Sequence, residues 1–474
     1  MATLRYQKRF NKWYVYEVTY YWDKELKKSR QLTKYMGVAT EKNGHYNKLP
    51  IKEPIVAVEN EIVDCGDSYA INEISKTIGL SAIIKDSFDD LDSIMALICF
   101  QITEGSAMHN CTDWLDGNIA KIIFPNAKIS SQNISNLFKT LGKQDLQVNF
   151  FKSYVAKFFP ENCGVLIDST ALPSAINDTI NAFGYASGSI EQNITCLMLV
   201  DKHTNLPIYF RAIGGDIADI STIKTTVAEI KKLGLKTDSA ILDAGFCSKE
   251  NLQFMCTEKI NFITRLPRSH KVFYELVKQT KYMMESSKNA VTYGDRVVFI
   301  KSKKVNLYDH DMYAHVFLDP SKKAKDTNLL LKNNLDDTLS KKDKQELDSK
   351  VKNAGYFILL SFNDIEKPNV LPSYYARQFI EQIFGFAKSN NNLLPLRVHS
   401  EQSIRGYLML SFLALIIFII MRQRVKMPMD KTLIALRSLK AKIFDTEVII
   451  QEVNKKNKDI MKSLKIILPT VLGI

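Results

Sequence analysis

Short apolar segments alternate with amphipathic ones between residues 164 and 267, and this alternation constrains the fold more than any other feature of the sequence. The apolar segments that predict strands are 164–168, the two arms of 193–215, 239–243 and 260–267. Helical spacing of apolar residues marks 220–235 and 248–259. The order is therefore three strands, a helix, a strand, a helix and a strand. This order predicts an α/β fold whose mixed sheet carries helices on its faces.

The composition narrows the class of protein. The 474 residues include 64 Lys and Arg against 51 Asp and Glu, a formal net charge of +13 that suits a polyanion such as nucleic acid or an anionic membrane surface. The seven cysteines form no Cys-x-x-Cys pair, and the polar, basic N-terminus does not resemble a signal peptide. We therefore expect a cytoplasmic protein with reduced cysteines. The histidines do not pair with cysteines at zinc spacings, so no structural metal is expected.

One uncharged segment, from Gly406 to Met421, raises the possibility of a membrane span. Its sixteen residues fall short of the roughly 20 that a spanning helix needs. Arg405 and Arg422 bound it, and no second apolar span accompanies it. The segment is therefore predicted to be a buried core helix.

The N-terminal half differs in character from the alternating region. Residues 1–50 contain eleven Lys or Arg, four Asp or Glu and ten aromatic residues, and Trp13 to Trp22 predicts one strand of a β-hairpin. Such a hairpin either contacts DNA or packs as an edge hairpin on the rest of the protein. Helical spacing after about residue 72 predicts a helical DNA-binding domain. The predicted domains are 1–50 (basic aromatic hairpin region), 51–160 (helical DNA-binding domain), 161–270 (core, first part), 271–372 (β-rich insertion), 373–425 (core, second part) and 426–474 (C-terminal helical tail).

The segment YYARQFIEQIFGFAK, which begins at Tyr374, predicts one amphipathic helix with a narrow polar edge. At about 100° per residue, Arg377, Glu381 and Lys388 fall with Tyr374 in a stripe roughly 60° wide. A glycine inside a helix costs about 1 kcal/mol relative to alanine, so Gly385 indicates a need for close access to this edge. The alternative is an ordinary solvated face. Exposed charges such as Arg377 and Lys388 are expected to contribute little to folding.

Two aspartates each follow an apolar strand: Asp168 in VLIDST and Asp243 in AILDAGF. Strand ends of this kind line the usual ligand crevice of an open sheet, although an aspartate taken alone in such a place is more often a helix or turn cap. With Glu381 on a helix returning to the same sheet, they make three carboxylates whose mutual repulsion a divalent cation would relieve. Oxygen ligands suit Mg²⁺ or Mn²⁺, and two such ions would support an in-line phosphoryl transfer.

The spacing Tyr-x2-Arg-x3-Glu-x6-Lys, formed by Tyr374, Arg377, Glu381 and Lys388, resembles the signature of bacterial insertion-sequence DDE transposases of the insertion-sequence-four type. The two aspartate contexts resemble the other acidic motifs of that family. The segment GGDIADIST around Asp219 resembles the stretch between them. The resemblance also includes the β-rich insertion and the apolar helix that follows the signature.

By this resemblance the chain is a transposase with a ribonuclease-H-like core. It would bind the terminal inverted repeats of an insertion sequence, cleave DNA at the element ends and join the 3'-OH ends to target DNA, using two Mg²⁺ or Mn²⁺ ions held by Asp168, Asp243 and Glu381. The implied partners are double-stranded DNA and a second copy of the chain in a synaptic dimer, at the nucleoid of a bacterial cytoplasm. The residues expected to contact DNA are Tyr374, Arg377, Lys388 and, in the strand at 260–267, Arg265.

Two other interpretations stay open. A catalytically inactive DNA-binding regulator or decayed element copy would not need all three carboxylates, and a nuclease without recombination activity would not need the basic aromatic N-terminus. The chain departs from some relatives in one respect, because those relatives hold a flipped base with a tryptophan of the insertion during hairpin formation. Trp13, Trp22 and Trp114 all precede the core here, so a tyrosine would have to take that role.

Overall fold

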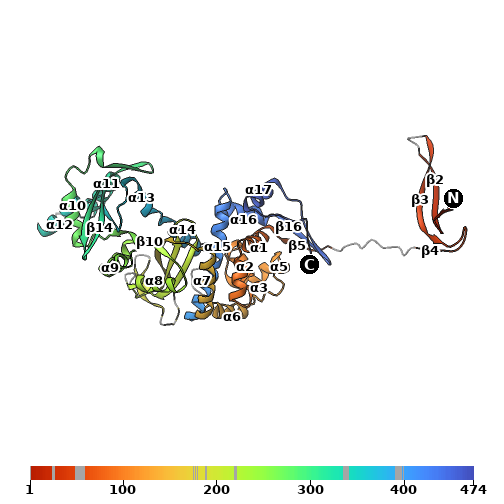
Figure 1. Cartoon of the computed structure of the whole chain (residues 1–474), viewed down its shortest axis with the longest axis horizontal. Helices are drawn as coiled ribbons and strands as arrows, with labels where there is room; N and C mark the ends of the chain where they lie inside the picture. Colours follow the sequence, from red (N-terminus) through yellow and green to blue (C-terminus); the bar gives the residue numbers. More distant parts are fainter. Residues whose placement is uncertain are drawn as a thin grey trace. The chain divides into compact units, whose positions relative to one another are not determined.

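A computed structural model of the whole chain describes residues 2–23, 27–48, 59–174, 176, 178, 180–186, 189–217, 221–334, 341–389, 398 and 400–473. Asp219, in the segment between the acidic motifs, lies outside the described residues. The chain divides into two compact units, Met1–Glu59 with Phe444–Thr446 and Asn60–Ile443 with Glu447–Ile474 (Figure 1).

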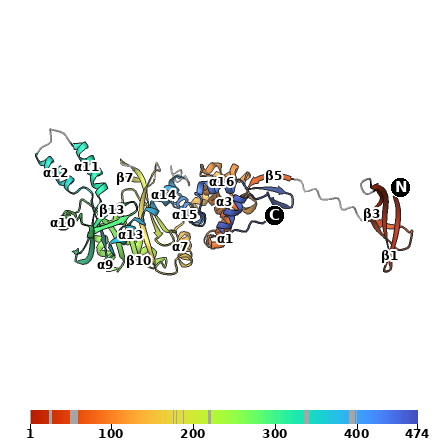
Figure 2. The same ribbon diagram turned by 90° about the horizontal axis from the view of Figure 1, so that it is seen from above.

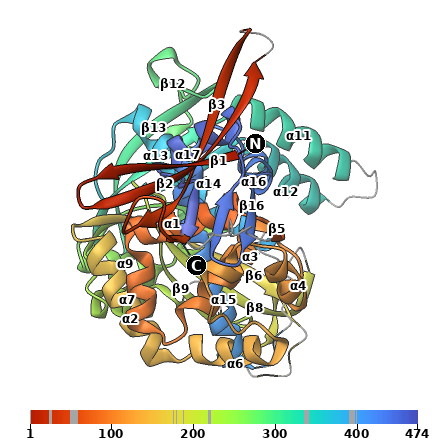
Figure 3. The same ribbon diagram turned by 90° about the vertical axis from the view of Figure 1, so that its right-hand side faces the viewer.

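The N-terminal unit contains a four-stranded antiparallel sheet (Figure 3). Its strands, in the order in which they pair, are β1 (Ala2–Arg9), β2 (Lys12–Asp23), β3 (Lys28–Ala39) and β4 (Tyr46–Lys48). The predicted hairpin corresponds to β2 and β3. Sequence analysis missed β1 because its mostly polar sequence, ATLRYQKR, lacks the apolar alternation that marks a half-buried strand. Pairing with β2 along its whole length, from Ala2–Thr19 to Arg9–Lys12, holds β1 in place.

A ten-stranded sheet forms the centre of the second unit, in the order β12-β13-β14-β15-β11-β10-β6-β8-β7, with β9 also paired to β8. The core strands are β6 (Cys163–Pro173), β7 (Ala182–Ala186), β8 (Ser189–Asp201), β9 (Pro207–Gly214), β10 (Thr237–Leu242) and β11 (Asn261–Leu266). Strands β6, β8 and β9 form an antiparallel meander, and β10 and β11 run parallel to β6. This is the ribonuclease-H-like arrangement, so the predicted α/β core is confirmed. The short strand β7 was not predicted.

The region between the core segments contains both strands and helices, and its strands extend the core sheet. Its strands are β12 (Ala290–Tyr293), β13 (Arg296–Leu307), β14 (His310–Leu318) and β15 (Tyr356–Ser361). Its helices are α10 (Lys271–Thr280), α11 (Pro320–Asn334) and α12 (Lys341–Lys352). Because β15 pairs antiparallel with β11, one continuous sheet includes both core and insertion. Helices α11 and α12 lie at the same end of this sheet as β13 (Figure 2).

The remaining helices cover the sheet and build the neighbouring helical region. Before the core they are α1 (Gly66–Ile78), α2 (Leu80–Ser87), α3 (Leu91–Thr103), α4 (Cys111–Asp116), α5 (Ala120–Ile123), α6 (Ser131–Leu141) and α7 (Gln144–Phe158). Within and after the core they are α8 (Ile223–Lys232), α9 (Lys249–Thr257), α13 (Lys367–Tyr375), α14 (Gln378–Ser389) and α15 (Glu401–Arg424).

Helix α15 connects the helical region to the sheet, because it packs against α3, α6 and β9 (Figure 1). Among the described residues it is the one helix long and apolar enough to cross a membrane, with 24 residues, but 94% of its most apolar stretch is buried inside the protein. The prediction of a buried core helix is therefore correct, but its reason was wrong. The helix is long enough to span a membrane, and its burial is what identifies it as a core helix. Close packing requires glycine at Gly406, since a Cβ there would lie 1.8 Å from the carbonyl oxygen of Phe138.

The C-terminal segment is only partly helical, so the expectation of a helical tail at 426–474 is wrong. Its elements are α16 (Met429–Arg437), β16 (Lys440–Phe444), β17 (Glu447–Ile450), α17 (Lys455–Leu464) and β18 (Val471–Gly473). The strands form a sheet with β5 (Glu59–Asp64) in the order β18-β17-β16-β5. Buried and partly exposed residues alternate along β16 and β17, which is the period of a strand rather than of a helix.

His315 is buried in β14 between serines of the two neighbouring strands, with Nδ1 2.8 Å from Ser302 Oγ and Nε2 2.9 Å from Ser361 Oγ. Burial lowers the pKa of His315 from the usual 6.5 to about 4. Between these values the unfolded chain binds more protons, so stability falls as the pH falls. We expect acidification from about pH 7 to about pH 5 to cost about 2 kcal/mol through this residue. Urea unfolding should show that His315→Gln removes this part of the pH dependence; an unchanged dependence would contradict the assignment.

Candidate active site

Two of the predicted carboxylates lie where the parallel pairing of β6 and β10 ends. The last pair joins Ile167 to Leu242, Asp168 is the next residue of β6, and Asp243 directly follows β10. The prediction that Asp168 ends its strand is wrong, because β6 continues along β8 to Pro173 after β10 has ended. Asp243 precedes the short helix η3 (Ala244–Phe246) but makes no side-chain capping bond there. Capping therefore does not explain its position.

The predicted single helix beginning at Tyr374 is two helices, α13 and α14, separated by a tight turn at Ala376 and Arg377. The N–H of Arg377 donates to the carbonyl of Tyr374 at 3.2 Å, a bond between residues three apart. Pro372 lies inside α13 and removes one helical donor just before this turn. Tyr374 lies on α13, before the break, and it is only 4% exposed.

The guanidinium of Arg377 lies between three carboxylates. Its Nη1 is 3.3 Å from Asp168 Oδ2, and its Nη2 is 3.3 Å from Asp243 Oδ1 and 3.1 Å from Glu381 Oε1. The three predicted carboxylates are thus brought together around one cation. The Arg377 side chain is 15% exposed, so the expectation that it is an ordinary surface charge is wrong.

Burial raises the pKa of Asp168 to about 7. The Arg377 guanidinium and the N–H of Ser169, which donates to Asp168 Oδ1 at 2.9 Å, act in the opposite direction. The neighbouring charges of Asp243 and Glu381 raise the pKa further. A buried carboxylate that resists ionisation beside two others is stabilised in its charged form by additional positive charge.

The donor set fits a divalent cation, because carboxylate oxygens are the ligands that Mg²⁺ and Mn²⁺ prefer. In the described parts of the chain, no group of three or more His, Cys, Asp or Glu side chains is already arranged to hold a metal ion. The guanidinium of Arg377 lies among Asp168, Asp243 and Glu381 instead. A metal ion bound by these carboxylates would take over contacts that Arg377 now makes.

Tyr374 lies next to Asp243, and Arg265 is close enough to Tyr374 to affect it electrostatically. The Tyr374 hydroxyl is 3.4 Å from Asp243 Oδ1, and the Arg377 guanidinium lies 5.6 Å from the centre of its ring. Burial raises the pKa of Tyr374 to about 12, so the hydroxyl is a neutral donor at neutral pH. Arg265, half-buried on β11, lies 5.7 Å from the ring centre of Phe357, and its charge lowers the pKa of Tyr374. The buried Tyr374 hydroxyl therefore helps to hold the Asp243 carboxylate in position.

Lys388 joins α14 to the strand that carries Asp168. Its Nζ donates to the carbonyl of Ala171 at 3.0 Å, and burial lowers its pKa. A Cβ at Gly385 would meet no atom within 4 Å, so packing does not require glycine there. The edge of α14 beside Glu381 therefore has room for a further group.

Sequence analysis missed two polar side chains that hold the segment around Asp243. Thr264 Oγ1 donates to the carbonyl of Asp243 at 3.2 Å, and the buried amide of Asn251 donates to the carbonyl of Phe246 at 2.9 Å. Thr264 pairs with Leu242 across the parallel strands β10 and β11. This pairing is what indicates the role of Thr264, and it can be recognised only once the register of the sheet is known.

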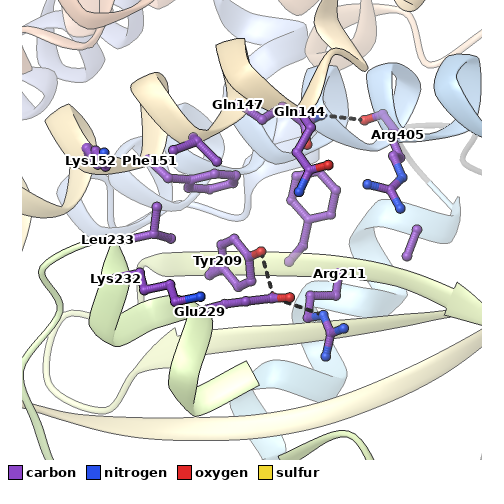
Figure 4. A pocket seen from close by; sticks show the side chains of 13 residues that line it. Gln144, Gln147, Phe151, Lys152, Tyr209, Arg211, Glu229, Lys232, Leu233 and Arg405 are labelled. Atoms are coloured by element: carbon purple, nitrogen blue, oxygen red, sulfur yellow. Dashed lines mark hydrogen bonds and ion pairs between the residues drawn. The ribbon is translucent and has the colours of Figure 1, made fainter. Parts of the chain in front are cut away.

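A cavity of about 500 Å³ lies elsewhere, at the edge strand β9 (Figure 4). Figure 4 shows Tyr209 and Arg211 directed towards Glu229 of α8, with the Tyr209 hydroxyl and Arg211 Nε each 3.0 Å from Glu229 Oε2. Strand pairing places Phe210 on the same sheet face as Asp168, so Tyr209 and Arg211 face the opposite side. The cavity is therefore separate from the carboxylates.

Residues 160–417, more than half of the chain, match the protein family described as the transposase DDE domain. Asp168, Asp243 and Glu381 all lie within the matched residues. No curated protein matches the sequence significantly. Among solved structures, the cryo-EM structure of a piggyBac transposase synaptic complex with hairpin DNA is similar, with a TM-score of 0.42 and 11% identity over 79% of this chain and 70% of that chain. A likeness this distant carries no argument about function.

Proposed function

The chain belongs to the DDE transposase family, and we propose that it binds the terminal inverted repeats of a bacterial insertion sequence, cleaves DNA at the element ends and joins the 3'-OH ends to target DNA. The observation that carries this proposal is the convergence of Asp168, Asp243 and Glu381 on Arg377. The Tyr-Arg-Glu-Lys spacing supports an element of the insertion-sequence-four type. Two copies of the chain would hold the element ends in a synaptic complex at the bacterial nucleoid.

We assign Asp168, Asp243 and Glu381 as the ligands of two Mg²⁺ or Mn²⁺ ions. Such a pair of ions stabilises the attacking and leaving oxygens of an in-line phosphoryl transfer. The chain supplies two fixed ligands and one adaptable one. Asp168 is held within β6 and by the Ser169 N–H, and Asp243 by Tyr374 and Thr264, whereas Glu381 lies on α14 with its side chain 52% exposed.

Arg377 has two roles in this proposal. Without metal it neutralises the carboxylates, and with metal bound it is free to contact a phosphate next to the scissile bond. A guanidinium suits both roles, since it makes charge-assisted hydrogen bonds to carboxylates and phosphates alike. Lys388 and Arg265 would contact the phosphates on either side. Tyr374 would act mainly by orienting Asp243.

The proposal is tested with a duplex that carries the inverted repeats flanking the gene. With Mg²⁺ or Mn²⁺ the purified protein is expected to cut at the repeat boundary and to join the resulting 3'-OH ends to a supercoiled target plasmid. A chelator should abolish both reactions. Binding without cleavage in either metal would favour the inactive regulator or decayed copy. Cleavage without joining would favour a nuclease.

A further inference from the structure

Positive charge is unevenly distributed between the N-terminal sheet and the helical region. Residues 1–50 contain eleven Lys or Arg against four Asp or Glu, a formal charge of +7, whereas residues 51–160 contain nine against fourteen, a formal charge of −5. The DNA backbone attracts the first region and repels the second. The charge therefore favours the N-terminal sheet as the DNA-contacting part, in place of the helical domain that the sequence suggested.

The two faces of the N-terminal sheet differ in their acidic residues. Residues that pair across antiparallel strands share a face, and the faces alternate along each strand. The pairs Arg5–Tyr16 and Arg9–Lys12 therefore place three cations on one face, which we call the cationic–aromatic face. The aromatic residues of β2 and β3 that the register adds to this face are Tyr14, Tyr16, Tyr20, Trp22 and Tyr35.

No carboxylate lies on the cationic–aromatic face within the described strands. Glu17 pairs with Lys34 and Asp23 with Lys28, and both pairs occupy the opposite face. Lys8 also lies on that opposite face, over the ring of Trp13 at 5.9 Å. The formal charge of both faces is therefore +3, but one face combines its cations and aromatic rings without acidic residues. The other reaches the same charge with five cations, since the register also places Arg30 and Lys48 there, and two carboxylates.

The cations of the cationic–aromatic face and its residues Tyr20 and Trp22 are exposed, whereas Tyr14 and Tyr16 are half-buried. Tyr20 is 60% and Trp22 63% exposed, and Phe10, in the turn between Arg9 and Lys12, is fully exposed at 100%. Aromatic rings interleaved with cations are typical of surfaces that bind nucleic acid. A cluster of this kind is rarely left uncovered in a soluble protein without a partner.

The shape of the sheet indicates duplex DNA. Strand β1 pairs with β2 only as far as Thr19, so the residues beyond it, Tyr20 to Asp23, pair with β3 alone and form a two-stranded ribbon (Figure 3). A two-stranded ribbon fits the major groove of B-DNA, and by itself it is only marginally stable in water. Gln31, opposite Tyr20 on the same face, carries an amide of the type that recognises adenine in that groove.

We propose that the cationic–aromatic face binds duplex DNA, with the β2–β3 ribbon in the major groove and Arg5, Arg9 and Lys12 against the phosphates. The inference rests on the proposed function, in which this DNA flanks the cleavage site. Tyr20 and Trp22 make apolar contact with base edges and sugars. The sheet anchors the protein on the duplex while the carboxylates act on its end.

The test compares two full-length variants with the same loss of charge, titrated with a short mixed-sequence duplex at several salt concentrations. The variant of the proposed face is Arg5→Gln/Arg9→Gln/Lys12→Gln. Its control on the opposite face is Lys8→Gln/Lys28→Gln/Lys34→Gln. We expect the first to weaken binding at least about tenfold and to reduce the slope of log affinity against log salt by about 2 to 3. The control should change both quantities much less.

A third variant keeps the positive charges of the proposed face, and a fourth removes only the aromatic ring of Trp22. Arg5→Lys/Arg9→Lys/Lys12→Arg should retain the parental slope, which separates charge from folding defects. Trp22→Ala should weaken binding several-fold without changing the slope. Circular dichroism and thermal unfolding establish that each variant is folded.

The outcomes distinguish this inference from the proposed function. Equal effects of the two glutamine variants would overturn the inference, because net charge alone would then explain binding. Preference for single-stranded over duplex DNA would overturn the groove assignment. If the parent binds and cleaves the duplex while the proposed-face variant keeps its affinity and slope, the inference fails and the transposase function stands. If the parent does not bind duplex DNA at all, both fail.

Discussion

Glu381→Gln is expected to abolish DNA cleavage and to leave DNA binding intact. Glutamine keeps the size and helix propensity of the side chain, and because Glu381 is 52% exposed its loss should cost folding only about 0–1 kcal/mol. The variant removes a negative charge that the proposed site needs to hold its cations. Metal ions contribute several kcal/mol of transition-state stabilisation, so cleavage should fall on the order of a hundredfold or more. A labelled element-end duplex with Mg²⁺ or Mn²⁺ provides the cleavage assay, and a band-shift titration provides the binding assay.

Glu401→Gln is the matched control for this variant. Like Glu381, Glu401 pairs with an arginine four residues away, although here the arginine follows the glutamate: Glu401 Oε1 is 2.6 Å from Arg405 Nη2, and its side chain is 39% exposed. The chemical change is therefore the same at a position outside the proposed ligands. The control should cleave like the parent. Parental cleavage by the Glu381 variant would show that Glu381 is not a ligand, and tighter binding by it would show that its charge repels DNA phosphates.

The core was predictable from the sequence because its signals are local. Apolar segments of strand length and helices of regular period mark β6, β8, β9, β10 and β11 with their intervening helices, and their order implies the sheet. The N-terminal strand β1 and the short strand β7 were missed, since the mainly polar side chains of β1 and the brevity of β7 leave no periodic pattern. Backbone pairing with a neighbour stabilises both strands, and a single strand's sequence does not record its neighbour.

The sequence allowed the residues of the candidate site to be predicted, but not how those residues are arranged. Asp168 and Asp243 follow apolar segments that pair in parallel, so their proximity could be inferred before the register was known. The position of Arg377 could not, because it depends on the turn between α13 and α14. Helical periodicity placed Tyr374 on the same polar edge, yet the packing around it buries the ring beside Asp243. Periodicity gives the direction of a side chain, whereas tertiary neighbours decide its burial.

The second large effect is expected from replacing Arg377, and it concerns the stability of the fold rather than catalysis. In the presence of a chelator, Arg377→Ala should lower the free energy of unfolding by about 2–3 kcal/mol, since it leaves the largely buried Asp168 and two further carboxylates without their shared cation. The measurement belongs near pH 8, above the Asp168 pKa of about 7, so that this carboxylate is ionised. Arg405→Ala, which breaks the more exposed pair with Glu401, should cost only about 0–1 kcal/mol.

Divalent cations should reverse much of this loss. A ligand that binds only the folded state stabilises it by mass action, and in the Arg377→Ala variant no guanidinium competes for Asp168, Asp243 and Glu381. Saturating Mn²⁺ should therefore stabilise this variant more than it stabilises the parent, while Arg405→Ala responds like the parent. Urea unfolding with and without Mn²⁺ measures both differences. A loss in Arg377→Ala that is the same in chelator and in Mn²⁺ would mean that the three carboxylates do not bind the ion, and that Arg377 is a permanent structural partner rather than a cation that metal replaces.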